Sequence, residues 1–113
     1  MQQGNVSLLA ASFTAGAAVL ANRFIGINGQ HAAAAANTIG VSRFDGAAGD
    51  LVTRDVLGTA IVEAGAAITA YAAIEVGADG KAVPHADGVV VARNQDAAAT
   101  AAGDFIEVLL VAN

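Results

Sequence analysis

The sequence predicts a mainly β protein, a small single-domain β-barrel or β-sandwich with an extended N-terminal arm and little helix. Residues 56–84 string short runs rich in β-branched residues together through glycine turns at nearly regular spacing. The dipeptides Asn28-Gly29 and Asp79-Gly80 favour tight hairpin turns, because both residue types accept positive φ angles. The alanine run within 31–38 is too short to form a helix alone in water.

The composition limits how stable such a domain can be. At 113 residues the chain is long enough for one core, and 30 Ala and 13 Gly together make up 43 of those residues. Each buried CH₂ stabilises by about 0.8 kcal/mol, whereas ordering the backbone costs about 1–2 kcal/mol per residue. Because an alanine-dominated core leaves little margin, we expect association with other copies or with a larger surface to supply part of the stability.

Charge and cysteine content exclude several classes of partner and site. Ten acidic residues outnumber five basic ones, which gives a net charge of −5, and the basic residues are scattered along the chain. This distribution predicts no nucleic-acid binding. Without cysteine there are no disulfides and no thiolate metal sites. The uncharged stretch 6–21 lacks a basic leader and is short for a membrane span, so we expect no membrane partner.

The β-type runs follow one another along the chain with turns or loops between them. Residues 31–38 are expected to form a loop or a single turn, and 45–49 a turn. Gly58 is expected to mark a β-bulge. Residues 56–84 should form a β-meander, in which consecutive strands pair. The expected strands are 17–20, 23–27, 38–44, 50–57, 59–63, 68–76, 81–83, 88–93 and 104–113.

Residues 1–12 are expected to form an arm that precedes the domain of residues 13–113. Their polar start and mixed pattern are more typical of an arm than of a core strand, and such an arm can order on a partner. The candidate contacts to a partner or to another subunit are the apolar side chains Val6, Leu8, Leu9 and Phe13.

An internal similarity suggests that the domain contains two related β units, at about 13–64 and 68–113. Residues 14–19 (TAGAAV) resemble 69–74 (TAYAAI), and the order of further matches is kept at nearly the same offset. Such a repeat predicts two similar β units wrapped into one small barrel or sandwich.

No pattern of catalytic, cofactor-binding or metal-binding residues stands out. His31 and His85 have no second ligand at metal spacing, and the Asp-Gly pairs lack the further ligands of a calcium loop. The acidic residues show no paired spacing, and no serine lies in a nucleophile elbow. We therefore expect neither an enzyme nor a metal or cofactor site.

Several stretches resemble the small capsid decoration (cement) proteins of tailed bacteriophages. The resemblance is carried by residues 58–68 (GTAIVEAGAAI), 79–83 (DGKAV), 14–19 and 103–108 (GDFIEV), and it spans about residues 13–113. It implies a β-tulip-type fold and a homotrimer, made in the host cytoplasm, on the outer surface of the phage head. There the family stabilises the capsid by clamping neighbouring major capsid subunits.

A protein of another functional class would also fit these observations. The chain would then be a subunit of a self-assembling shell, cage or fibre with no separate coat partner. Copurification with a different coat protein separates this alternative from a decoration protein.

Overall fold

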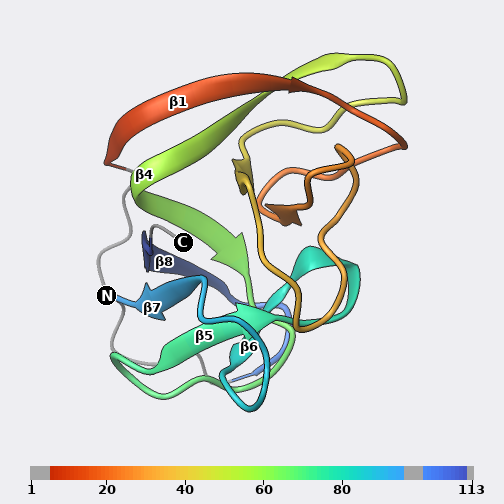
Figure 1. Ribbon diagram of the computed structural model, residues 1–113. Helices are drawn as coiled ribbons and strands as arrows, with labels where there is room; N and C mark the ends of the chain where they lie inside the picture. The colour runs from red at the N-terminus through yellow and green to blue at the C-terminus, as the bar shows by residue number, and fades with distance from the viewer. Residues whose placement is uncertain (1–5, 96–100, 112–113) are drawn as a thin grey trace.

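The computed structural model describes residues 6–95 and 101–111, and almost all of its regular structure is β-strand (Figure 1). The strands pair in the order β2-β3-β4-β8-β7-β5-β6, while β1 pairs with β4 beside this path, and the sheet nearly closes into a barrel. The prediction of a mainly β domain is confirmed. The strands are β1 (Ser7–Thr14), β2 (Phe24–Ile25), β3 (Gly40–Ser42), β4 (Leu51–Glu63), β5 (Ala73–Val76), β6 (Ala82–Pro84), β7 (Ala92–Asn94) and β8 (Phe105–Leu110).

Strand β4 connects the two parts of the sheet. Its first half pairs with β1 and β3, and its second half pairs with β8. Figure 1 shows the sharp bend between these halves. Gly58 has φ +97°, and the register between β1 and β4 is irregular next to it, so the expected bulge is confirmed. The two strands expected at 50–57 and 59–63 are instead one bent strand, because the glycine turns the chain without ending the pairing.

The predicted meander across 56–84 is correct in one of its two pairings. Strand β5 pairs with the next strand, β6, as predicted, whereas the second half of β4 pairs with β8 instead of β5. The other neighbour of β5 is β7. Residues 64–72 separate β4 from β5, and this connection is too long for a tight hairpin. The edge of β4 is therefore filled by a strand from the end of the chain.

Two predicted hairpin turns are present, with different backbone geometry. Between β5 and β6, Asp79 and Gly80 have φ +57° and +72°, as the two-residue turn requires. At Asn28-Gly29 only the glycine has positive φ, and Gly26 N–H donates to the carbonyl of Gln30 at 2.8 Å. The turn at Asn28-Gly29 is therefore a three-residue loop of residues 27–29.

Some expected strands are shorter in the structure. The 68–76 run becomes a strand only at β5, since Tyr71 has φ +61° and interrupts extended backbone. The 88–93 run becomes a strand only at β7, and within 17–20 the one bridge in the described chain joins Val19 to Gly46. The 31–38 segment forms a loop, as expected, and β8 confirms the closing strand.

Residues 7–12, expected in a free arm, belong to β1. Alternate residues of this segment direct their backbone groups to β4, which provides hydrogen bonds that an arm would take only from a partner. Residues 1–5 of the expected arm, 96–100 of the expected loop and 112–113 of the last strand lie outside the described residues. The division into two similar β units stays a prediction.

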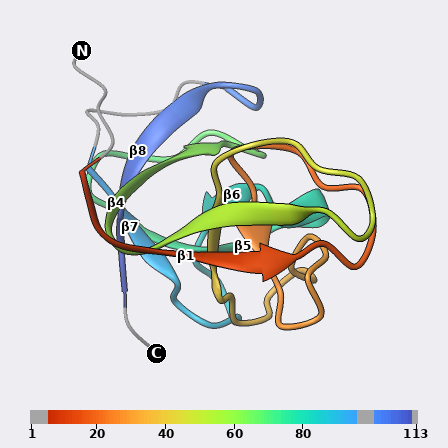
Figure 2. The ribbon, with the colours of Figure 1, turned by 90° about the horizontal axis from the view of Figure 1, so that it is seen from above.

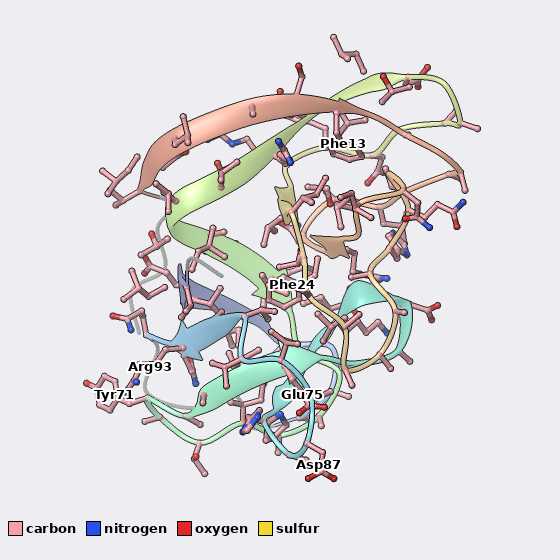
Figure 3. The ribbon with its side chains drawn as sticks, in the orientation of Figure 1. Phe13, Phe24, Tyr71, Glu75, Asp87 and Arg93 are labelled. Carbon is pink, nitrogen blue, oxygen red and sulfur yellow. The ribbon has the colours of Figure 1, made fainter. Side chains whose placement is uncertain are left out.

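The buried side chains form two clusters. The larger lies among β4, β5, β7 and β8 and includes Phe24, which is completely buried. The smaller lies under β1 and contains Phe13, Ile25 and Val52. Because Phe24 and Ile25 are consecutive residues of β2, they point to opposite faces and reach different clusters. Figure 3 shows Phe13 below β1 and Phe24 nearer the centre of the molecule.

Candidate functional site

The structure separates the four residues that the sequence suggested as contacts. Val6, Leu8 and Leu9 are exposed at the start of β1, with Leu8 at 77%. Phe13 is only 8% exposed and packs into the smaller cluster. Its ring is therefore unavailable to a partner, whereas the other three side chains remain accessible.

Further exposed aliphatic residues lie around the bend of β4. Ser7 is opposite Gly58 and Leu109 is opposite Thr59, so β1 begins and β8 ends at the same point of β4. This juxtaposition depends on non-local pairing, and no local signal in the sequence indicates it. We call the exposed set around this point the bend patch, and it consists of Val6, Leu8, Leu9, Leu57, Leu109 and Val111.

A groove lies next to the bend patch. It is bounded by the start of β3, the bend of β4 and the end of β8, and its lining includes Ile39, Val56, Leu57, Leu110 and Val111. None of its lining residues is charged. An uncharged groove beside exposed aliphatic side chains suits a protein partner better than a charged small molecule.

The charged side chains near β1 and β4 are occupied within the molecule. Arg43 Nη2 lies 2.6 Å from the carboxylate of buried Asp55. Arg54 Nη1 donates to the carbonyl of Ile39 at 3.1 Å. Residues 7–14 carry no charge at all. The start of β1 therefore presents backbone and uncharged side chains to its surroundings.

An ionic cluster joins β2, β4 and the β5–β6 turn. Arg23 is buried and donates to the Glu63 carboxylate and to the Asp79 carbonyl, each at 3.1 Å. Lys81 Nζ lies 3.3 Å from the same carboxylate. Burial alone would raise the pKa of Glu63, but the hydrogen bonds and charges of Arg23 and Lys81 outweigh it and lower the pKa below 4.5. The cluster holds the two parts of the fold together.

A second carboxylate organises the loop after β6. Glu75 Oε1 accepts hydrogen bonds from Ala86 N–H at 2.6 Å and Gly88 N–H at 3.0 Å. Figure 3 shows this side chain beside the loop that carries Asp87. The two backbone hydrogen bonds, with a smaller contribution from His85, lower the pKa of Glu75 below its ordinary value of 4.5. The ionised carboxylate thus fixes the loop.

We expect Glu75 to make stability depend on acid pH. Because its pKa is lower in the folded chain, its contribution is fully present above about 4.5 and is lost as the pH falls through the folded-state pKa. Glu75→Gln should destabilise the chain at neutral pH and flatten the acid limb of the stability profile. Urea denaturation at a series of pH values measures both effects. Asp87→Asn, on the same loop but exposed, is the control and should leave the profile unchanged. If stability falls with acid pH in Glu75→Gln as it does in the wild type, Glu75 is not the group responsible.

The described residues contain no cluster of three or more side chains suited to holding a metal ion. In the same part of the chain, no helix has the length and apolar character needed to cross a membrane. Among the described residues, the bend patch combines six exposed aliphatic side chains with an adjoining uncharged groove.

Comparisons with known proteins agree with a structural role. A family model described as phage cement protein matches residues 1–110. Among solved structures, the chain is similar to the head fiber gp8.5 N base of bacteriophage phi29, with a TM-score of 0.74 and 24% identity. The match covers 91% of this chain and 93% of the other, and at this identity it shows a shared fold. Among curated proteins there is no match.

Proposed function

The chain belongs to the phage cement protein family, and from this premise we propose that it binds the outer surface of the head and clamps neighbouring major capsid subunits. Family membership makes it a capsid-associated structural protein of the virion and indicates no catalytic role.

The bend patch is the observation that carries this proposal. Its aliphatic side chains surround the point where β1 begins and β8 ends, and an uncharged groove adjoins them. Exposed apolar surface of this kind marks protein interaction sites. The major capsid protein is the partner that the family's role on the capsid suggests.

Clamping would stabilise the head through many modest contacts. A partner that binds only the folded chain stabilises it by mass action, which suits a domain with an alanine-rich core. Many copies on one particle would add their contributions.

We further propose that the chain is made in the host cytoplasm and acts as a homotrimer. Light scattering of the purified chain, alone and released from heads, measures the number of copies.

Truncating Leu8 tests the contact surface. Burying a leucine side chain is worth about 1.5–3 kcal/mol, so Leu8→Ala should weaken binding to undecorated heads by about ten- to a hundred-fold. Cosedimentation with purified expanded heads measures the affinity. Leu51→Ala is the matched control, because Leu51 is 73% exposed at the opposite end of the β1–β4 pair, about 20 Å away. Equal affinities for both variants would show that the bend patch is not the contact.

A further inference from the structure

We propose that the head partner adds a strand to the free edge of β1, and that this strand is an extended, uncharged segment of the major capsid protein. The inference rests on the proposed function and specifies how the partner is recognised. Strand addition uses backbone hydrogen bonds for affinity and side-chain packing for specificity.

One edge of β1 is free. In the described chain, β1 pairs with β4 alone. Figure 1 shows β1 along the top of the molecule, and Figure 2 looks down on it from above, where it crosses the molecule beside β4. A strand at such an edge presents a row of backbone donors and acceptors to a second strand.

The hydrogen-bonding pattern identifies which backbone groups point outward. Ala15 N–H donates to the carbonyl of Asp50 at 2.8 Å. Because alternate residues of an antiparallel strand bond to the same neighbour, Ala11 and Phe13 also face β4. Ala10 and Ser12 therefore direct their N–H and C=O groups away from β4.

The opposite edge of β4 gives an independent check of this alternation. Arg43 N–H donates to the carbonyl of Thr53 at 2.9 Å, so Thr53 and Asp55 bond toward β3. These two residues lie opposite Ser12 and Ala10. Since each β4 residue bonds to one side only, neither of them satisfies the backbone groups of its β1 partner.

The other ends of the sheet are covered by this chain. At β6, Gly65 N–H donates to the Ala82 carbonyl at 2.7 Å. At β2, Ala32 N–H donates to the Phe24 carbonyl at 2.9 Å. Edge strands in isolated proteins are usually protected by charges, proline or short length. Strand β1 spans eight residues and has neither charge nor proline. Its edge is therefore suited to receiving another strand.

The surroundings of β1 define the chemistry of the added strand. Leu8 and Leu9 are consecutive exposed residues, so both faces of an incoming strand would meet aliphatic side chains. The nearby Arg43 and Asp55 neutralise each other. An uncharged strand with apolar side chains complements this edge, whereas a charged one would lose hydration without gaining an ionic partner.

A second copy of this chain is a poorer occupant. Each copy carries a net charge of −5, so two copies placed edge to edge would repel. Antiparallel pairing of β1 with the β1 of another copy would also be two-fold symmetric, which does not generate the proposed three-fold assembly. Neither argument applies to a segment of the major capsid protein.

Amide hydrogen exchange of the free chain and of decorated heads tests the inference. On heads, the amides of Ala10 and Ser12 should exchange at least ten-fold more slowly than in the free chain. Those of Ala11 and Phe13 should be protected in both states, because they already bond to β4. Residue-resolved mass spectrometry of the 7–14 segment reads this alternation, which packing of side chains alone would not produce.

The outcomes separate the two proposals. Binding to heads without slower exchange at Ala10 and Ser12 would overturn strand addition and leave the proposed function standing. Absence of binding would overturn both. Slower exchange at these amides in the free chain at high concentration would assign the edge to a second copy and overturn the coat segment as occupant.

Proline at position 10 provides a second test. Ala10→Pro removes an outward N–H, and proline is tolerated on edge strands where that group faces solvent. We expect at least ten-fold weaker head binding, with an unchanged β-type circular dichroism spectrum. Ala10→Val keeps the N–H and should bind at least ten-fold more tightly than Ala10→Pro. Equal binding by both folded variants would contradict strand addition.

Discussion

Replacing Gly58 by alanine should destabilise the chain by about 3 kcal/mol or more. An L-residue at φ +97° costs about 1–2 kcal/mol, and the new Cβ would collide with the Val6 carbonyl oxygen and approach Leu8 N to 2.9 Å. Either β1 must leave its place on β4 or β4 must straighten. Because the bend patch depends on this geometry, head binding should fall as well. Chemical denaturation measures the loss of stability.

Gly49→Ala is the matched control for Gly58→Ala. Gly49 also has positive φ, at +90°, but a Cβ there would have no heavy atom within 4 Å. Its substitution should lower the free energy of unfolding by about 1–2 kcal/mol, the cost of placing an L-residue at positive φ. The difference in free energy of unfolding between the two variants then measures the cost of the collision with β1. Equal losses would show that β1 is not held against the bend.

Replacing Phe24 by alanine should cost about 3–5 kcal/mol. Its side chain is 0% exposed in the larger cluster, and no other aromatic residue belongs to that cluster in the described chain. Since domains of this size are stable by about 5–15 kcal/mol, the loss would remove much of the total. Thermal and urea denaturation measure it.

Phe44→Ala is the control for the Phe24 substitution. Phe44 is 59% exposed, and a substitution there should change stability by no more than about 0.5 kcal/mol. A similarly small effect at Phe24 would show that the larger cluster does not hold the fold. If heads bind only the folded chain, they should also stabilise the Phe24 variant. At a concentration of free head sites one hundred times the dissociation constant, the free energy of unfolding of this variant should rise by about 2.7 kcal/mol.

Local chemistry made part of this fold predictable. Asp79 and Gly80 accept positive φ, and their turn lies where the sequence placed it. The closing strand and the bulge at Gly58 were also predictable from local pattern. In contrast, the partner of β4 was not, because β8 is more than forty residues away and its pattern fits several neighbours.

The candidate site was predictable only in its β1 component. Val6, Leu8 and Leu9 are exposed, as a contact role requires. Phe13 is buried because it faces Val52 across the β1–β4 pair, which the expectation of an arm concealed. Leu57 and Val111 joined the patch only once the strand pairing was known.

The central claim is that this chain stabilises phage heads by binding their outer surface. The most direct measurement is the disruption temperature of purified, expanded, undecorated heads with increasing amounts of the chain. We predict saturable binding and a disruption temperature that rises until the sites are filled. No binding, together with assembly of the chain alone into a shell, cage or fibre, would contradict the account.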